Sequence, residues 1–141
     1  MPRIKFIEEE RLNDFLRQAM PEWDKSMVQS GETTWWGFQD HTFIDFFLNS
    51  AAWYWKQAPE EIDLKLLTNR SPTEQKISGK FERRHVKFWG EATNFLSTTW
   101  VCGNYVIMLN TRNKPFYLVE IQNALMAHDQ REVFKNLWPL V

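Results

Sequence analysis

The segment from Ser97 to Ile121 constrains the fold of this chain more than any other stretch. It holds three short runs of apolar and β-branched residues, separated by two groups of turn-forming residues, Gly103-Asn104 and Arg112-Asn113-Lys114-Pro115. Glycine and asparagine adopt the positive φ that tight turns between antiparallel strands need. The middle run is almost wholly apolar, so we expect it to be a strand covered on both faces. The three predicted strands span residues 98–102, 105–109 and 116–121.

Upstream of this segment, predicted strands alternate with predicted helices. Apolar alternation and β-branched or aromatic enrichment indicate strands over 2–8, 33–38, 62–67 and 84–88. Helical spacing and capping residues indicate helices over about 8–30, 42–57, 72–79 and 124–138. Pro21 either kinks the first helix or starts a second one. Strands separated by helices favour parallel neighbours and the hairpins add antiparallel ones, so we predict a single α/β domain over residues 1–141, a mixed sheet flanked by helices.

Composition and charge exclude several classes of protein. The net charge of −1 provides no overall basic surface of the kind that a DNA-binding domain usually carries. Cys102 is the only cysteine, so the chain forms neither an internal disulfide nor a cysteine-rich zinc site, which is compatible with a reducing cytoplasm. No apolar run approaches the ~20 residues of a membrane helix. We therefore expect a cytoplasmic protein with no membrane partner.

Four segments, taken in order, carry a resemblance that covers essentially the whole chain. They are PRIKFIEE, IDLKLLTN, TTWVCGNYVIML and YLVEIQNALMAHDQREVFKNLW. Through their order and spacing the chain resembles the effector domain of TrmB-like transcriptional regulators, which is similar to one half of a phospholipase D fold. The resemblance implies a regulatory domain that senses an effector or dimerises, with a second copy and a small-molecule effector as its partners.

TrmB-like regulators carry a winged helix-turn-helix domain before this effector domain. In this sequence the first predicted strand begins at Pro2, which leaves no room for a DNA-reading helix. We therefore expect contact with DNA only through a helix-turn-helix domain that is missing from this sequence.

The resemblance also implies that the chain is not an enzyme. Phospholipase D enzymes use the motif H-x-K-x4-D, and Ser97, Thr99 and Asn104 stand at its three positions in this sequence. These side chains replace the nucleophilic histidine, the phosphate-holding lysine and the aspartate. His85-Val86-Lys87 is the only H-x-K, but Ala92 occupies the position where aspartate is required. A degenerate phosphodiesterase is a further hypothesis, with Ser97 and His85 as its test positions.

Metal and cofactor sites are not expected either. The histidines, at positions 41, 85 and 128, share no ligand spacing. Asp40 is interpreted as the N-cap of the helix that begins at Thr42 rather than as a ligand. Cys102, on a strand beside a turn, is interpreted as a small half-buried side chain rather than a nucleophile.

Seven residues are candidates for ligand binding: Trp36, Asn69, Arg84, Thr99, Asn104, Glu120 and Arg131. Glu120 interrupts an apolar strand, and a buried carboxylate needs a partner. We expect Arg131 or Arg84 to supply it in an ion pair that stabilises the fold. The alternative is that Glu120 lines a ligand pocket.

The segment from Lys65 to Lys87 carries seven lysines and arginines against two acidic residues. With Trp36 and Trp89 expected nearby, it is either a surface for phosphate or nucleic acid or an ordinary solvated face. It supports an alternative function, a stand-alone nucleic-acid or nucleotide-binding protein. The aromatic residues between positions 35 and 55 exceed what one small core holds, so we predict a homodimer through the helix over 42–57 or the N-terminal helix.

Overall fold

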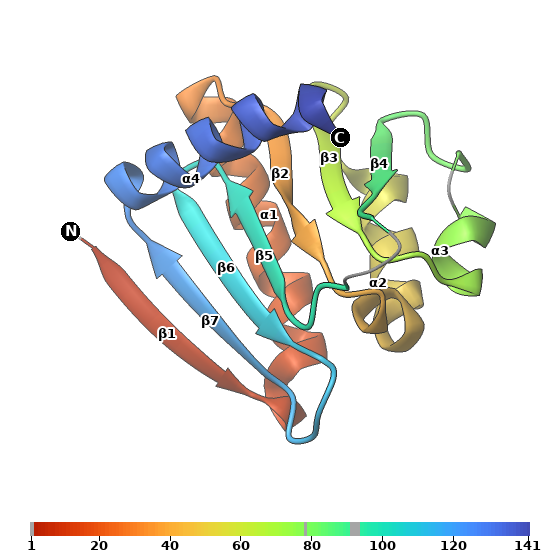
Figure 1. Cartoon of the computed structure of the whole chain (residues 1–141). Coiled ribbons are helices and arrows are strands. Elements are labelled where there is room, and N and C mark those ends of the chain that lie inside the picture. The colour runs from red at the N-terminus through yellow and green to blue at the C-terminus, as the bar shows by residue number, and fades with distance from the viewer. Residues whose placement is uncertain (1, 78, 91–93) are drawn as a thin grey trace.

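A seven-stranded mixed sheet organises the computed structural model, which describes residues 2–77, 79–90 and 94–141 (Figure 1). The strands are β1 (Arg3–Glu8), β2 (Thr34–Gln39), β3 (Asp63–Thr68), β4 (Arg84–Phe88), β5 (Thr98–Cys102), β6 (Tyr105–Asn110) and β7 (Tyr117–Gln122). They lie in the order β1-β7-β6-β5-β2-β3-β4. β2, β3 and β4 run parallel to one another, and the other neighbouring pairs are antiparallel. The predicted α/β fold with a mixed sheet is therefore confirmed.

Four α-helices flank this sheet in the described part of the chain: α1 (Leu12–Ser30), α2 (Thr42–Gln57), α3 (Pro72–Ile77) and α4 (Ala124–Leu137). Short 3-10 turns precede α1 and follow α4, at Glu9–Arg11 and Trp138–Leu140. α1 runs through Pro21 as one helix, so the alternative of a second helix starting at Pro21 is wrong. It ends at Gly31, whose φ of 74° lets its N–H bond the carbonyl of Val28.

The main hydrophobic core lies on the face of the sheet that α1 and α2 cover (Figure 1). Trp23 of α1, Trp35 of β2 and Trp100 of β5 meet there edge to face, with ring centroids 5.0, 5.8 and 6.1 Å apart. Gly37 lets β2 and β5 approach each other, because a Cβ at this position would lie 2.1 Å from the carbonyl oxygen of Thr99. Only glycine fits at this point of the core.

α4 covers only part of the opposite face. Its buried side chains pack on one row of cross-strand neighbours, Trp36, Val101, Val106 and Ile121. In the next row, Met108 of β6 is 40% exposed, so the prediction that this strand is covered on both faces is wrong. The reason is that α4 crosses the strands near one end and leaves their other end open (Figure 1).

The remaining differences from the predicted elements are small. Four strands extend one residue further than predicted, to Gln39, Thr68, Asn110 and Gln122. These polar residues keep their places in the sheet register, so pairing rather than hydrophobicity sets the strand ends. The predicted loop over 90–96 includes positions 91–93, among them Ala92, which lie outside the described residues, as does Ser78 in the predicted third helix. Among the described residues, no helix combines the length and apolarity that crossing a bilayer demands.

Candidate functional site

A polar cluster lies at the edge of the sheet where β2, β3 and β6 end. Its centre is Asp40, a fully buried carboxylate directly after β2. Arg112 holds both oxygens, with Nε 2.9 Å from Oδ2 and Nη2 2.9 Å from Oδ1. Asn69 donates to Oδ1 at 3.3 Å, and the amide of Thr42 donates to the same oxygen at 3.2 Å. The N-cap residue of α2 is His41, so the prediction that Asp40 is the N-cap is wrong by one residue, although its side chain accepts a hydrogen bond from the amide of Thr42, the first residue of the helix.

The groups around Asp40 are also tied to one another. Asn69 binds the backbone of Phe95 in both directions, with Nδ2 2.9 Å from its oxygen and Oδ1 2.7 Å from its nitrogen. Thr98 accepts a hydrogen bond from the amide of Asp40 at 3.1 Å. A carboxylate held by a bidentate arginine and two amide donors is not free to act as a base. The cluster therefore anchors strand ends to one another rather than presenting open groups to a substrate.

His41 lies beside this cluster. Its Nδ1 is 3.5 Å from Oδ1 of Asp40, and its Nε2 is 3.8 Å from Oδ2 of Asp45. Within residues 2–77, 79–90 and 94–141, no group of three or more His, Cys, Asp or Glu side chains is arranged to hold a metal ion.

The Gly103-Asn104 turn between β5 and β6 is packed between two helices. Gly103 has a φ of 58°, and a Cβ there would lie 2.6 Å from Oγ of Ser26 on α1. Its carbonyl accepts a hydrogen bond from Arg131 of α4, and the amide of Asn104 donates to Oγ of Ser26 at 3.0 Å. Cys102, one residue earlier, is fully buried, and burial raises the pKa of its thiol well above its usual range. The turn therefore joins both helical layers to the sheet. The thiol of Cys102 stays protonated at neutral pH.

The predicted ion pair between Glu120 and an arginine is wrong. Glu120 lies on the α1 side of the sheet, where its Oε2 accepts a hydrogen bond from Nε1 of Trp23 at 2.8 Å. Arg131 lies under α4, on the opposite side of the sheet. Arg84 pairs instead with Glu74 at 2.5 Å, and both side chains are buried.

The seven ligand-binding candidates do not form one site. Two of them, Asn104 and Arg131, meet at the turn between β5 and β6. The others are spread over both faces and one edge of the sheet: Trp36 and Thr99 on the α4 face, Asn69 at the edge, Arg84 and Glu120 on the face of α1 and α2. A single ligand can therefore contact only some of them.

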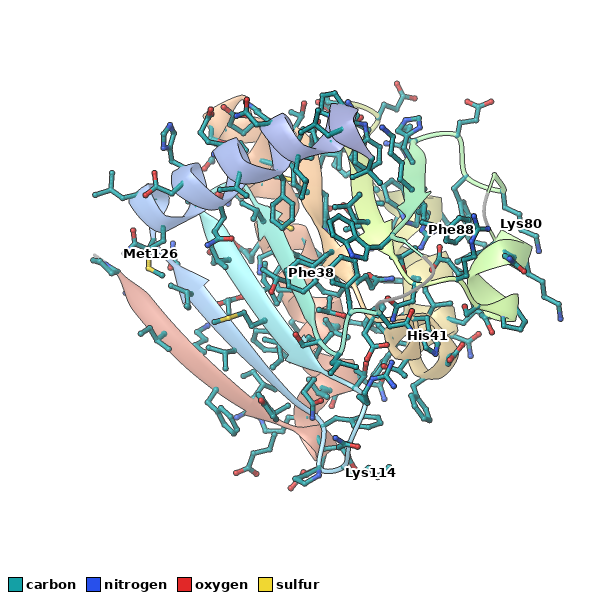
Figure 2. All side chains as sticks on the ribbon, viewed as in Figure 1. Phe38, His41, Lys80, Phe88, Lys114 and Met126 are labelled. Carbon is teal, nitrogen blue, oxygen red and sulfur yellow. The ribbon has the colours of Figure 1, made fainter. Side chains whose placement is uncertain are left out.

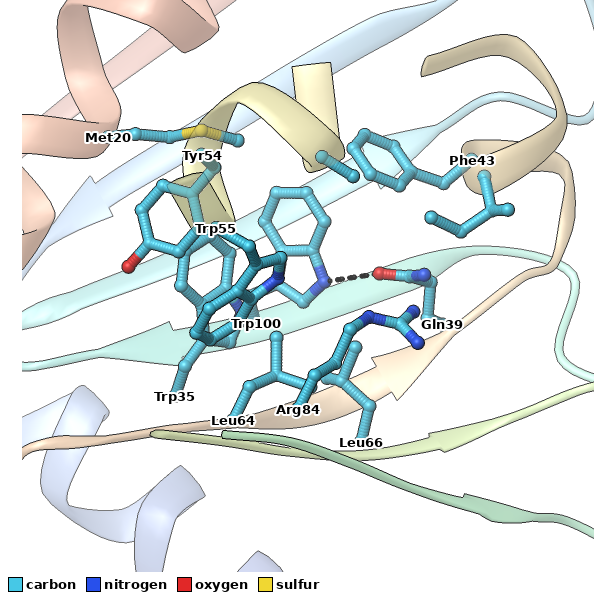
Figure 3. Close-up of a pocket in the computed structure, with 12 residues that line it drawn as sticks. Met20, Trp35, Gln39, Phe43, Tyr54, Trp55, Leu64, Leu66, Arg84 and Trp100 are labelled. Atoms are coloured by element: carbon cyan, nitrogen blue, oxygen red, sulfur yellow. Dashed lines mark hydrogen bonds between the residues drawn. The ribbon is translucent and has the colours of Figure 1, made fainter. Parts of the chain in front are cut away.

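Arg84 reaches a small cavity inside the core (Figure 3). The cavity has a volume of about 30 Å³ and mostly apolar walls. On its wall, Nε1 of Trp100 donates to Oε1 of Gln39 at 3.0 Å. Within the described chain, Nε2 of Gln39 and Nε1 of Trp35 have no hydrogen-bond partner. This volume accommodates a water molecule but no organic effector.

The basic segment from Lys65 to Lys87 contains both structural and exposed cations. Arg83 donates to three carbonyls that follow α2, those of Ala58, Pro59 and Ile62. Arg84 is committed to its buried ion pair. Lys76 and Lys80, in contrast, are exposed. Replacing the two arginines would therefore perturb the fold, and the two exposed lysines are the better test of nucleic-acid binding.

An uncovered apolar surface occupies the part of the sheet that α4 leaves bare. We call it the open sheet face and define it by five residues from four neighbouring strands: Phe6, Thr99, Met108, Tyr117 and Val119. Four of them are successive cross-strand partners and form one row from β1 to β5. Phe6 is 60% exposed, and Met108 and Tyr117 are each 40% exposed. Large contiguous apolar side chains in water mark a surface for interaction.

One side of α4 borders the open sheet face. Met126, Val133 and Leu137 share this side because they are seven and four residues apart, and we call them the α4 flank. Met126 is 46% exposed and Val133 is 60% exposed. In Figure 2, Met126 lies below the N-terminal end of α4, on the side of the bare strands. The open sheet face and the α4 flank together form one apolar step.

Sequence reasoning missed this surface. The signal was present in the first strand, where Ile4 and Phe6 point to one side and Ile7 to the other. A strand with apolar residues on both sides needs cover on both sides. In the structure, Ile7 is buried under α1, whereas Ile4 is 73% exposed.

Two solved structures share this fold. NucT from Helicobacter pylori is similar with a TM-score of 0.56 and 9% sequence identity, over 96% of this chain and 95% of that chain. TrmBL2, described as an archaeal chromatin protein with a novel mode of DNA binding, is similar with a TM-score of 0.58 and 10% identity. The similarity covers 97% of this chain and 52% of TrmBL2, so this chain spans about half of that protein. No protein-family model and no curated protein matches the sequence.

Proposed function

We propose that this chain is a non-catalytic regulatory domain, of the kind found in TrmB-like transcriptional regulators, that acts by forming a homodimer. The observation that carries this proposal is the apolar step formed by the open sheet face and the α4 flank. A second copy of the chain is the occupant that fits this step.

The bare part of the sheet has room for one more helix. Strands of six residues, such as β1, β6 and β7, are about 20 Å long, and a helix with its side chains is about 10 Å wide. α4 therefore occupies about half of the strand length. The four strands that form the exposed row span roughly 14 Å across the sheet. The distance along the axis of α4 from Met126 to Val133 is about 10 Å, so this apolar length of helix fits within the width of the row.

A twofold axis makes this step self-complementary. Each copy offers a bare half of its sheet and one helix, so each copy can cover the other. The apolar flanks of the two α4 helices then face each other. The outermost side of α4 carries Asp129, Glu132 and Asn136, which gives the contact a polar part, as is common in interfaces that form reversibly.

The buried state of Asp40 and the residue types at the three motif positions support the non-catalytic part of the proposal. Asp40 is closed off by Arg112 and amide donors. Ser97, Thr99 and Asn104 supply neither an imidazole, an ammonium nor a carboxylate at the three motif positions. The likeness to TrmBL2 in fold, and its description as a DNA-binding chromatin protein, is in keeping with a regulatory role.

Sedimentation of the native chain and of two variants tests the dimer. Met108→Lys and Val133→Lys each place an ammonium in the apolar step, and in a twofold interface each change occurs twice. Since an unpaired buried charge costs several kcal/mol, the dissociation constant should rise by at least about 100-fold. Both positions are already exposed in one copy, so the melting temperature of the monomer should change little.

Leu48→Lys is the matched control. Leu48 is 36% exposed on α2, the helix that the sequence analysis proposed as an interface. A chain that is monomeric at micromolar concentration, or a dimer that Leu48→Lys dissociates and the other two variants do not, overturns the proposal. Turnover of a generic phosphodiester that disappears in Ser97→Ala or His85→Ala overturns its non-catalytic part.

Nucleic-acid binding through the basic segment is the second candidate function. The exposure of Lys76 and Lys80 favours it, since unpaired surface cations are what phosphates contact. Salt-dependent binding of single-stranded or duplex DNA, weakened by Lys76→Ala with Lys80→Ala and unchanged by Lys56→Ala on α2, would support it. Binding that is indifferent to these lysines would exclude this segment as the contact.

A further inference from the structure

A groove runs between the first part of α1 and the edge of the sheet formed by β1, β7 and β6. Its volume is about 420 Å³, within the range of pockets that hold small molecules. Apolar side chains such as Phe15 and Ala19 form part of its wall. Its polar lining comes from both the helix and the strands: Lys5, Arg11, Gln18, Glu22, Tyr105 and Glu120.

Glu120 is the unusual member of this lining. It lies in the middle of β7 and is only 6% exposed. One carboxylate oxygen accepts the indole N–H of Trp23 at 2.8 Å, and among the described residues neither a second hydrogen bond nor an ion pair reaches the carboxylate. A carboxylate has room for about four donors, so a single hydrogen bond does not fill it. Glu120 therefore presents unused acceptor capacity at the wall of a groove.

The lining of the groove holds two anions, Glu120 and Glu22, and two cations, Lys5 and Arg11. Lys5 stands directly opposite Glu120 in the register of β1 and β7, but its side chain is exposed and forms no ion pair with it in the described chain. Glu22 lines the same groove from α1. The pKa of the Tyr105 phenol is raised, first by burial and then by the charges of Glu120 and Glu22. The charge of Arg3 acts in the opposite direction, and the charges of Glu120 and Glu22 outweigh it at Tyr105.

We propose that this groove binds a small molecule that carries an ammonium group, anchored by the carboxylate of Glu120. Glu22 adds a second negative charge, Tyr105 and Gln18 offer polar contacts, and the apolar stem of the ligand packs on Phe15 and Ala19. An ammonium supplies the donors and the charge that Glu120 lacks. The inference does not depend on dimer formation, because Glu120 faces α1 whereas the open sheet face lies on the other side of the sheet. Phe6 on the edge strand borders both surfaces, so no variant at Phe6 is used in either test.

Trp23 provides a direct reporter for this site. Its indole N–H donates to Glu120, so its resonance in the N–H spectrum should shift when an ammonium joins the same carboxylate. The eight tryptophans give up to eight indole signals, and Trp23→Phe identifies the one that belongs to Trp23. The two probes are butylamine and butyrate, which have four carbon atoms each and carry opposite charges. Butylamine should shift the Trp23 signal in a saturable manner and butyrate should not.

Three variants decide the role of the charges. Glu120→Gln keeps the shape and an acceptor for Trp23, and it should weaken butylamine binding by about tenfold, as expected for loss of a charged hydrogen bond. Glu22→Gln, on the exposed side of α1, should weaken butylamine binding by a few-fold. This variant replaces Glu120→Gln as the test if Glu120→Gln fails to fold. Lys5→Gln removes the competing cation and should strengthen binding. Glu132→Gln on α4 is the control and should have no effect.

Three results would overturn the inference. The first is a shift of the Trp23 signal by butyrate that is as large as the shift by butylamine. The second is a Trp23 signal that butylamine leaves unmoved. The third is an affinity for butylamine that is the same in Glu120→Gln or Glu22→Gln as in the native chain. A chain that fails these binding tests but still dimerises leaves the proposed function intact. A chain that binds butylamine through Glu120 but stays monomeric leaves this inference intact.

Discussion

Replacing Asp24 with asparagine should stabilise this protein, and the gain should depend on pH. Asp24 lies on α1 with 8% of its surface exposed, and its Oδ1 accepts a hydrogen bond of 2.5 Å from the hydroxyl of Tyr54 on α2. Burial raises the pKa of Asp24 from 3.8 to about 6, although the bond from Tyr54 and the charge of Arg83 act to lower it. The ionised form is therefore disfavoured in the folded state.

The sign of the effect follows from this shift. Because the folded chain binds the proton more tightly than the unfolded chain, the contribution of Asp24 to stability is fully present below about pH 3.8 and is lost as the pH rises through about 6. A shift of roughly two units, at 1.36 kcal/mol per unit, corresponds to roughly 3 kcal/mol. Solvent screening reduces this figure, so we expect a cost of about 1–3 kcal/mol at neutral pH.

Urea unfolding followed by tryptophan fluorescence measures this cost. Asp24→Asn removes the charge and still offers Tyr54 an acceptor, so the stability of the variant relative to the native chain should rise by about 1–3 kcal/mol between pH 4 and pH 8. Measuring both chains at one protein concentration removes any contribution from self-association. Asp14→Asn, in the exposed first turn of the same helix, is the matched control for other effects of losing a carboxylate.

A difference between Asp24→Asn and the native chain that is constant over this pH range would refute the reasoning. Tyr54→Phe gives a second check with the opposite sign. Without the hydroxyl, the carboxylate of Asp24 loses its donor, so this variant should lose more stability at pH 8 than at pH 5.

Two other substitutions test the sheet itself. Arg112→Ala removes the bidentate cation from the buried carboxylate of Asp40, and it should lower the unfolding free energy by about 2–4 kcal/mol, as denaturant titrations can show. Gly37→Ala places a Cβ 2.1 Å from the carbonyl of Thr99, so β2 and β5 must separate, and the variant should lose at least about 3 kcal/mol or fail to fold. Normal stability of Gly37→Ala would show that β2 and β5 are not packed as closely as described.

The features that could be predicted from sequence are those formed by residues close together in the chain, such as helix caps and helix ends. Ser71 caps α3, because its Oγ accepts a hydrogen bond from the amide of Glu74 three residues later at 3.0 Å. Asn123 caps α4 through the amides of Leu125 and Met126. Gly31 ends α1 with the left-handed conformation that glycine favours. In each case both partners lie within a few residues, so the local pattern contains the whole interaction.

The open sheet face could not be predicted in the same way, although its residues were visible. The run from Tyr105 to Leu109 is apolar on both sides, and the natural expectation is that both sides are covered. Whether a helix lies over Met108 depends on the direction in which α4 crosses the sheet. That direction follows from packing Phe134 and Ala127 on one particular row of strand residues. An apolar strand therefore shows only that its two faces need cover, and it does not show which part of the molecule, or which partner, supplies that cover.

The contacts of Glu120 show most clearly that local sequence patterns do not predict long-range partners. They also show how the groove beside α1 is formed. Strand alternation places Glu120 on the side opposite to Ile121, and Ile121 contacts α4, so Arg131 of α4 was never within its reach. Its actual partner, Trp23, is 97 residues away. The two meet because β1 pairs with β7, which brings the first strand and the helix after it against the last strand. The groove is made by this pairing: Glu120 comes from the end of the chain, and the apolar wall comes from its beginning, as does Lys5, which faces Glu120 in the register without forming an ion pair with it. A carboxylate without a cation of its own is unremarkable in a linear sequence, and it becomes a candidate anchor for an ammonium only when the fold shows which wall faces it.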